Sequence, residues 1–177
     1  GTGYVGLTVA CLADFGHQVV LIGRSQDKID LINKGVSSIY EPGLDEIIKR
    51  NIENKNLKAT NDYNEILDSD IVFVCVGTPS KEDGSIDLSQ IENVSKSVGE
   101  KLKETNKHVV VVVKSSIVPN TTKNFVIPIL EKYSGKKAGK DFGVGMNPEF
   151  LREGSGVADF LYPDKIVIGG IDEKSKN

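Results

Sequence analysis

The chain has 177 residues, of which 38% are hydrophobic and 27% charged, and its formal net charge is −3. This length fits one domain, and the composition is that of an ordinary globular protein. The acidic balance argues against nucleic-acid binding, which usually needs a basic excess, and no apolar run is long enough to cross a membrane. We therefore expect a cytoplasmic protein with no nucleic-acid or membrane partner.

Short runs rich in valine and isoleucine alternate with longer helical patterns along the chain. This alternation is typical of βαβ units whose helices cover both faces of a parallel sheet. The sequence therefore predicts an α/β fold, a Rossmann-type, doubly wound and mostly parallel sheet. The expected strands, of which the second has the weakest pattern, are 19–22, 57–60, 71–76, 109–113, 143–146 and 166–168.

Helix start signals lie between these runs. Pro119 suits the first turn before a helix at 124–133, because proline has no N–H to lose there. Two further pairs have the spacing at which an N-cap side chain and the residue three positions later satisfy backbone N–H groups. They are Asp62 with Glu65, and Asp87 with Gln90.

The chain opens on a glycine-rich turn that precedes an apolar helical pattern over 7–15 and then the strand at 19–22. In the spacing G-x-G-x-x-G, the glycines allow a tight turn, close approach of the backbone to a pyrophosphate, and close packing of helix on strand. The helix N-terminus then offers N–H groups to the phosphates. We expect the strand that feeds this turn to precede the chain. The predicted dinucleotide-binding residues are Gly1, Gly3, Tyr4, Val5 and Gly6.

The strand at 19–22 is not followed by an acidic residue. An Asp or Glu at that place accepts hydrogen bonds from the ribose hydroxyls of NAD. Here Gly23, Arg24 and Ser25 follow instead, with Lys28 one helical turn later. Positive charge and a hydroxyl suit the 2′-phosphate of NADP. We expect an NAD(P) cofactor with NADP favoured; the alternative is that Arg24 is only a solvated residue at a corner of the chain.

Seven further motifs occur in the order known from one enzyme family. They are YEPGL at 40–44, VGTP at 76–79, DGSIDL at 83–88, KSS at 114–116, PNTT at 119–122, NPEFLREG at 147–154 and PDKIVIG at 163–169. In these motifs the whole chain resembles the N-terminal NAD(P)-binding domain of the UDP-glucose and GDP-mannose dehydrogenase family.

The resemblance implies oxidation of the C6 alcohol of a nucleotide sugar to a carboxylate in two hydride transfers. In this family a cysteine holds the aldehyde as a thiohemiacetal, which is oxidised to a thioester and hydrolysed. That cysteine lies in a C-terminal domain, and neither Cys11 nor Cys75 has its surroundings. We expect residues 1–177 to form the dinucleotide-binding domain, inactive alone. The central helix, through which a homodimer would form, and the catalytic domain are expected outside this chain.

Several substrates and one different class of function are compatible with these motifs. The first expectation is oxidation of UDP-glucose to UDP-glucuronate for polysaccharide synthesis, with GDP-mannose or a UDP-N-acetylhexosamine as the alternative. A dinucleotide-binding module without chemistry is the rival of another class. A hydroxyacid dehydrogenase of the 6-phosphogluconate type shares the fold, but the motif at 147–154 argues against it.

The resemblance also assigns roles at the expected sugar site. Glu149 matches a glutamate that assists attack of water on the thioester, and a partly shielded carboxylate has a pKa suited to such a base. Glu153 matches a glutamate that lines the substrate site, together with Phe150, Leu151 and Arg152. The structural alternative is an exposed pair of glutamates at a helix start.

Hydroxyl groups follow two of the predicted strands. Ser116 stands where the family commonly has threonine, and its hydroxyl remains available to a water or a sugar oxygen. Thr78 and Ser115 follow strand ends, where ligands bind in open α/β sheets, and we expect both to contact the cofactor. The alternatives are a turn residue before a proline for Thr78, and simple closure of the strand for Ser115 and Lys114.

The remaining reactive or unusual residues are expected to be structural. Cys11 and Cys75 lie in apolar runs, which indicates buried thiols. His17 and His108 each precede a strand without a metal-ligand neighbour, so we expect solvated histidines and no metal site. Asn120 stands where the family commonly has glycine, and asparagine tolerates the positive φ such a turn needs.

Overall fold

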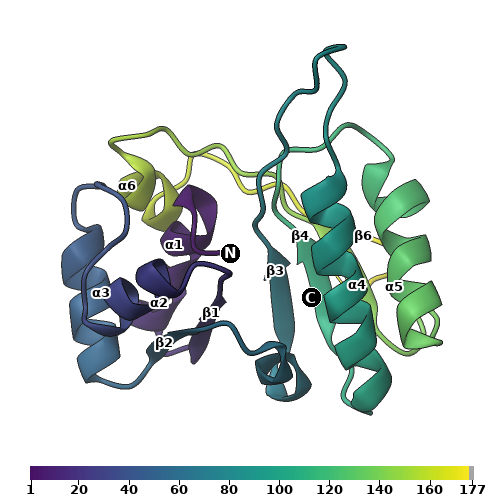
Figure 1. Cartoon of the computed structure of the whole chain (residues 1–177), viewed down its shortest axis with the longest axis horizontal. Coiled ribbons are helices and arrows are strands. Elements are labelled where there is room, and N and C mark those ends of the chain that lie inside the picture. The colour runs from purple at the N-terminus through teal and green to yellow at the C-terminus, as the bar shows by residue number, and fades with distance from the viewer. Residues whose placement is uncertain (176–177) are drawn as a thin grey trace. The chain divides into compact units, whose positions relative to one another are not determined.

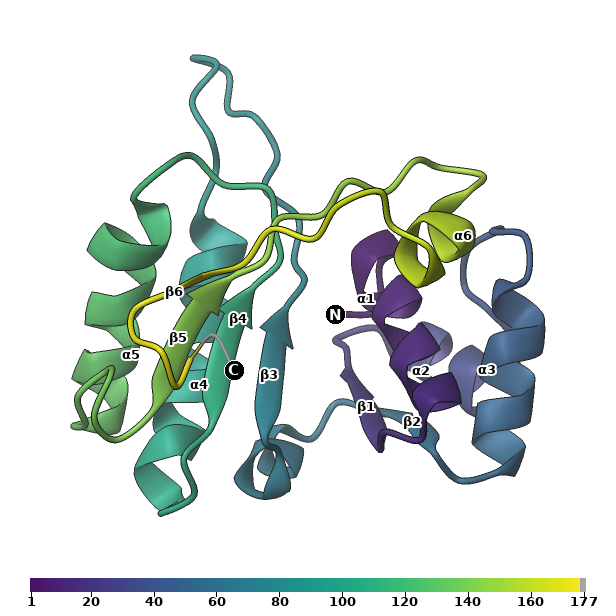
Figure 2. The same cartoon turned by 180° about the vertical axis from the view of Figure 1, so that it is seen from behind.

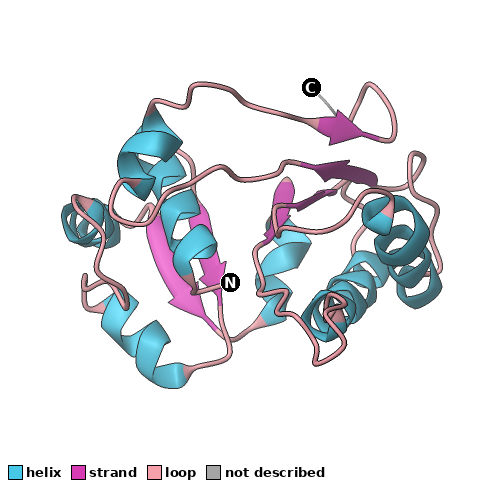
Figure 3. Cartoon of the chain, turned by 90° about the horizontal axis from the view of Figure 1, so that it is seen from above, coloured by secondary structure: helices cyan, strands magenta, loops and turns pink. Residues whose placement is uncertain are grey.

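The computed structural model describes residues 1–175, which form two compact units (Figure 1). The first unit contains Gly1–Asp62 and Phe150–Ile166. The second contains Tyr63–Glu149 and the residues from Val167 onward. Each unit packs helices against hydrogen-bonded strands, as the α/β prediction requires (Figure 3).

The first unit is built around two parallel strands. Val19 pairs with Leu57 and Ile22 with Thr60, so the two strands end at the same edge. Gly16, at φ 86°, ends the first helical segment, which agrees with the end of the expected helical pattern over 7–15. Its elements are α1 (Tyr4–Val9), the 3₁₀ helix η1 (Ala10–Phe15), β1 (Val19–Ile22), α2 (Gln26–Asn33), α3 (Leu44–Glu53), β2 (Leu57–Thr60) and α6 (Gly156–Leu161).

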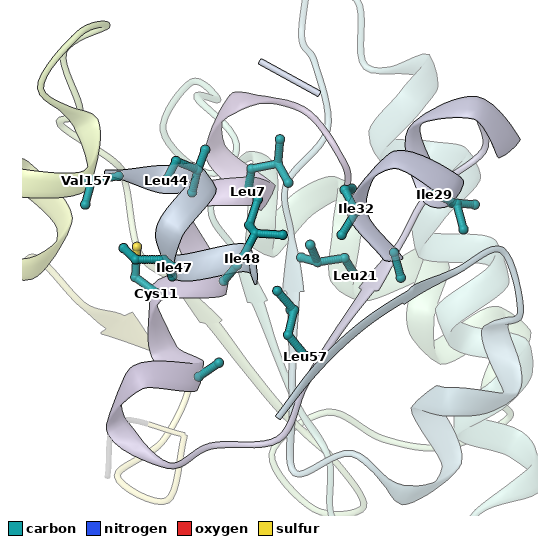
Figure 4. Packing of buried hydrophobic residues seen from close by; sticks show 13 residues of the cluster. Leu7, Cys11, Leu21, Ile29, Ile32, Leu44, Ile47, Ile48, Leu57 and Val157 are labelled. Carbon is teal, nitrogen blue, oxygen red and sulfur yellow. The ribbon is translucent and has the colours of Figure 1, made fainter. Parts of the chain in front are cut away.

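One apolar cluster holds the first unit together (Figure 4). Leu7 of α1, Ile32 of α2 and Ile48 of α3 have no exposed surface and pack around Leu21 and Leu57 of the strands. Burial of each such side chain contributes about 1.5–3 kcal/mol. Val157 of α6 belongs to the same cluster, so a segment from late in the chain is part of the core of its beginning.

The second unit contains a four-stranded sheet in the order β3-β4-β5-β6. The first three strands are parallel, and the last pairs antiparallel with β5. Figures 1 and 2 show α4 and α5 together on one face of this sheet. The elements are the 3₁₀ helix η2 (Tyr63–Asp68), β3 (Ile71–Val74), α4 (Ser89–Glu104), β4 (Val110–Val113), the π-helix η3 (Thr122–Val126), α5 (Ile127–Ser134), β5 (Gly143–Met146) and β6 (Gly169–Gly170).

Most of the expected strands are confirmed, and one is wrong. Residues 166–168 form no strand, and the pairing with β5 begins only at Gly169. Side chains of Ile166, Val167 and Ile168 are between 44% and 67% exposed, so the apolar run is not part of a core within the described residues. An apolar run predicts burial, but which surface covers it depends on the tertiary arrangement.

The helix starts differ from expectation in detail. Asp87 accepts the N–H of Ser89 at 2.8 Å, two residues on, so the predicted pairing with Gln90 is wrong. Only a 3₁₀ helix follows Asp62. Pro119 lies in a turn before the helical segment, and Asn120 has φ 69°, which confirms the expected positive φ.

Candidate cofactor and substrate site

The glycine turn at the start of the first unit leaves no room for a side chain at Gly6. A Cβ atom on Gly6 would lie 1.9 Å from the carbonyl oxygen of Gly1, whereas a Cβ on Gly3 would meet nothing within 4 Å. Gly3 precedes α1 in extended conformation, and no side chain caps the helix. Gly6 therefore serves close packing within the turn, and Gly3 leaves open the side where a phosphate can approach.

The end of β1 lies against this turn. A Cβ atom on Gly23 would be 2.5 Å from the Thr2 side chain, so these two segments touch. Arg24, Ser25 and Lys28 follow, and all three are exposed. Within residues 1–175, neither Arg24 nor Lys28 forms an ion pair, so both cations are available to an anion beside the glycine turn.

The carboxyl ends of three parallel strands meet at one edge of the second sheet. Val74 of β3, Val113 of β4 and Met146 of β5 lie in register. Ligands of open α/β folds bind outside this edge. The residues that follow the strands there include Thr78, Lys114, Ser115, Ser116, Asn147 and Glu149.

Lys114 is a buried cation at this edge, with only 7% of its surface exposed. Its Nζ donates to Oδ1 of Asn147 at 2.8 Å, and Nδ2 of Asn147 donates to the carbonyl of Val167 at 2.9 Å. Burial lowers the pKa of Lys114, and the negative charge of Glu149 opposes that effect. Asn147 was not assigned a role from the sequence, where only the residues from Glu149 to Glu153 of its motif were expected to be functional.

The hydroxyl groups at this edge join the strand ends. Ser115 is buried, and its Oγ both donates to the carbonyl of Val76 at 2.7 Å and accepts the N–H of Val76 at 2.9 Å. Thr78 donates to the carbonyl of Ser116 at 2.7 Å. The Ser116 side chain itself is exposed. Contact of Thr78 and Ser115 with a cofactor stays a prediction.

The segment expected to contact the sugar belongs to the first unit and begins at Phe150. Lys165 places its Nζ 4.7 Å from the centre of the Phe150 ring. The guanidinium of Arg152 binds both carboxylate oxygens of Asp159, with Nη2 2.6 Å from Oδ1 and Nε 3.1 Å from Oδ2. This ion pair holds the pKa of Asp159 well below its usual range. Arg152 is thus engaged within its own segment, while Glu153 is exposed.

Glu41 is a buried carboxylate that the sequence patterns did not identify as functional. It is 5% exposed; its Oε1 accepts the N–H of Gly156 at 2.6 Å and its Oε2 that of Gly154 at 2.9 Å. The Tyr4 hydroxyl, beside it, donates to the carbonyl of Arg152 at 2.7 Å. Burial, and then the Glu41 carboxylate, raise the pKa of Tyr4 to about 12.

The cysteines are structural, as expected. Cys11 and Cys75 are free and buried, and burial raises the pKa of Cys11 to about 11.

The two histidines differ in their surroundings. His17 is exposed, as expected. For His108 the expectation of a solvated ring is wrong, because its Nε2 is buried without a hydrogen-bond partner in the described residues. Over residues 1–175, no three His, Cys, Asp or Glu side chains gather as a metal site, and no helix could span a bilayer.

The chain is similar to nucleotide-sugar dehydrogenases over 99% of its length. It is 47% identical to a GDP-mannose 6-dehydrogenase of Pseudomonas aeruginosa and 46% identical to a UDP-glucose 6-dehydrogenase of Haloferax volcanii. It spans 41% of the length of each.

Solved structures give the same result. A ternary complex of GDP-mannose dehydrogenase from Pseudomonas aeruginosa superposes with a TM-score of 0.97 at 46% identity, with 99% of this chain and 41% of that one covered. The UDP-glucose dehydrogenase of Pyrobaculum islandicum gives 0.93 at 38% identity, with coverage of 99% and 40%. These likenesses confirm the Rossmann-type fold.

The model of the UDP-glucose/GDP-mannose dehydrogenase family, NAD binding domain, matches residues 1–177. The glycine turn agrees with this match, because Gly1, Gly3 and Gly6 have the spacing of a dinucleotide-binding turn and Gly6 packs closely against Gly1. The chain therefore belongs to the UDP-glucose/GDP-mannose dehydrogenase family, of which it is an NAD-binding domain.

Proposed function

We propose that the protein to which this chain belongs oxidises the C6 alcohol of a nucleotide sugar to a carboxylate, with a nicotinamide dinucleotide as hydride acceptor. The observation that carries this proposal is the similarity to nucleotide-sugar 6-dehydrogenases along 99% of the chain. The cofactor would lie on the glycine turn of the first unit. A homodimer formed by a segment beyond these residues, and a cytoplasmic location, are parts of the same proposal.

GDP-mannose is the first substrate to test. The relatives at 47–49% identity include several GDP-mannose 6-dehydrogenases. UDP-glucose, the expectation from the sequence motifs, is the second candidate, because a UDP-glucose 6-dehydrogenase is 46% identical. The two identities are so close that the substrate must be decided by activity.

Glu149 is proposed as the base that activates water for hydrolysis of the thioester. It follows β5 at the sheet edge, and its negative charge acts on the buried ammonium of Lys114. A carboxylate at the ligand-binding edge of the sheet is a group that can accept a proton from water. The hydroxyl of Ser116 is proposed to bind that water or the sugar oxygen, and Glu153 to bind the sugar.

The finer choice of cofactor depends on the end of β1. We propose that Arg24, Ser25 and Lys28 bind the 2′-phosphate of NADP. All three are exposed directly after the strand that touches the glycine turn. Gly23, Arg24 and Ser25 carry no carboxylate that would repel a phosphate, and a guanidinium binds phosphate oxygens in pairs.

The full-length protein tests these proposals directly. It should reduce cofactor when mixed with GDP-mannose or UDP-glucose, and the near-ultraviolet absorbance of reduced nicotinamide measures the rate. Two molecules of cofactor should be reduced for each uronate formed. UDP-N-acetylhexosamines serve as further candidates, each with NAD and with NADP. Cofactor binding without turnover of any of these sugars would contradict the proposed reaction and favour a binding module.

A further inference from the structure

A carboxylate from one loop binds two backbone N–H groups of another loop in the first unit. Glu41 accepts hydrogen bonds from Gly156 at 2.6 Å and Gly154 at 2.9 Å, although more than one hundred residues separate them along the chain. Gly154 has φ 88°, a conformation that few residues other than glycine adopt. The loop conformation and the carboxylate therefore depend on each other.

Tyr4, the first residue of α1 after the glycine turn, contacts the same loop. The Tyr4 hydroxyl donates to the carbonyl of Arg152 at 2.7 Å. A Cβ atom on Gly156 would lie 2.1 Å from this hydroxyl, so the start of α6 packs directly on Tyr4. The ion pair of Arg152 with Asp159 makes the loop itself compact. Tyr4 thus joins the glycine turn to the segment that begins at Phe150.

The Glu41 carboxylate is the buried part of this arrangement. Glu41 is 5% exposed, and a polar group removed from water needs hydrogen-bond partners, which the two N–H groups supply. Hydrogen bonds to an ionised group are stronger than neutral ones, and an unpaired buried donor is costly. The loop over 152–156 therefore has few alternative positions while Tyr4 and Glu41 are in place.

We propose that Tyr4 and Glu41 are positioning residues that couple dinucleotide binding to nucleotide-sugar binding. This inference rests on the proposed function, in which the glycine turn binds the cofactor and 150–153 contacts the sugar. A dinucleotide on the turn fixes the start of α1 and with it Tyr4. Tyr4 then holds the carbonyl of Arg152, and Glu41 holds the next residues, so the sugar segment is ordered before the sugar arrives.

Coupling of this kind is reciprocal. If the cofactor tightens sugar binding by a given factor, the sugar must tighten cofactor binding by the same factor. Couplings between sites in proteins are about 5- to 150-fold. Loss of one hydrogen bond of the Tyr4 kind changes an equilibrium by about two- to tenfold. We expect Tyr4→Phe to reduce the coupling factor by that amount.

The full-length protein tests this with a pair of ligands that cannot react. Reduced cofactor and the nucleotide sugar form a dead-end complex, because no hydride acceptor is present. Titration calorimetry gives the Kd of the sugar with and without reduced cofactor, and the Kd of the reduced cofactor with and without the sugar. For each ligand, the coupling ratio is its Kd without the other ligand divided by its Kd with the other ligand. In the wild type, the two ratios should exceed one and agree. In Tyr4→Phe, both should move toward one.

Matched variants separate coupling from a general loss of structure. Glu41→Gln should also lower the ratio, because an amide NH₂ replaces one acceptor and faces a backbone N–H. Glu46→Gln removes the same charge from an exposed position of the neighbouring helix, and Tyr162→Phe removes a hydroxyl from an exposed ring. Both controls should keep the wild-type ratio. If Glu41→Gln does not fold, Tyr4→Phe alone decides.

The outcomes are distinct from those of the proposed function. A wild-type ratio of one, or an unchanged ratio in Tyr4→Phe, overturns the coupling while turnover of the sugar leaves the proposed function intact. Failure of the wild-type protein to bind either ligand overturns both. A ratio that falls in Tyr4→Phe but not in Tyr162→Phe supports the coupling.

Discussion

The carboxylate of Glu41 accepts the N–H of Gly156 at 2.6 Å, across 115 positions of the chain. Gly156 is the first residue of α6, whose N-terminal N–H groups have no partner within the helix. A negative charge is also favourable at a helix N-terminus. Glu41 therefore caps a helix whose next residue, Val157, packs into the core of the first unit.

Tyr4 should resist ionisation in the folded protein. Burial and the Glu41 carboxylate raise its pKa from 10.0 to about 12. A raised pKa of an acid means that the neutral form is favoured by folding; this contribution to stability is complete below pH 10 and is lost as the pH rises towards 12. The difference in tyrosinate absorbance between wild type and Tyr4→Phe measures it. At pH 10 this difference should be small. A difference equal to half the absorbance of one fully ionised tyrosine would indicate a hydroxyl with an ordinary pKa and would contradict the prediction.

Substitution by alanine should have different effects at Gly3 and at Gly6. Gly6→Ala places Cβ 1.9 Å from a backbone oxygen, so both the free energy of unfolding and NAD affinity should fall. Gly3→Ala meets nothing within 4 Å, so the free energy of unfolding should stay within about 0.5 kcal/mol of wild type. Its methyl group should still weaken NAD binding, because the pyrophosphate approaches that side. Urea unfolding and a binding titration measure the two effects. Unchanged NAD affinity in Gly3→Ala would contradict the phosphate position.

Arg24→Ala should separate the two cofactors. Loss of a charge-assisted contact to the 2′-phosphate costs about 1.5–3 kcal/mol, which is about 10- to 150-fold in the Kd of NADP. The Kd of NAD should change little, because NAD carries no 2′-phosphate. Fluorescence titration with both reduced cofactors measures this, and Lys34→Ala, an exposed lysine after α2, is the control. Tighter binding of NAD than NADP to the wild type would contradict the NADP preference.

Glu149→Gln should slow hydrolysis more than the first oxidation. Removal of a general base costs about 10²- to 10⁴-fold in the step that it assists. Sugar affinity should stay nearly unchanged, because glutamine keeps the size and one acceptor oxygen. Stopped-flow measurement on the full-length variant should show a rapid burst of reduced cofactor followed by slow turnover. A steady-state rate equal to wild type would exclude the role as base.

Much of the fold follows from local patterns. The strands at 19–22, 57–60 and 143–146 were predicted to the residue, because the residue preferences that favour a short strand act over a few positions. The conformation of Asn120 was predicted for an equally local reason, a steric tolerance of its own side chain. The family could also be identified from short motifs, because a motif is a local pattern and does not depend on contacts between distant residues.

Other features depend on which segments meet. The run at 166–168 has the apolar composition of a strand, but a strand needs a partner, and only Gly169 and Gly170 find one on β5. The role of Lys114 was left open because its partner, Asn147, is 33 residues away. Hydrogen bonding and burial between distant residues have no periodicity by which the sequence could reveal them.

The sequence by itself determined the glycine turn, the alternation of strands and helices, and the family. Tertiary structure alone decided that Glu41 is a buried carboxylate on Gly154 and Gly156, and that Tyr4 bonds to the carbonyl of Arg152. The physical reason is the distance along the chain over which each kind of interaction acts. Steric and periodic preferences act within one turn or one strand, whereas the environment of a buried polar group is set by chain segments that only folding brings together.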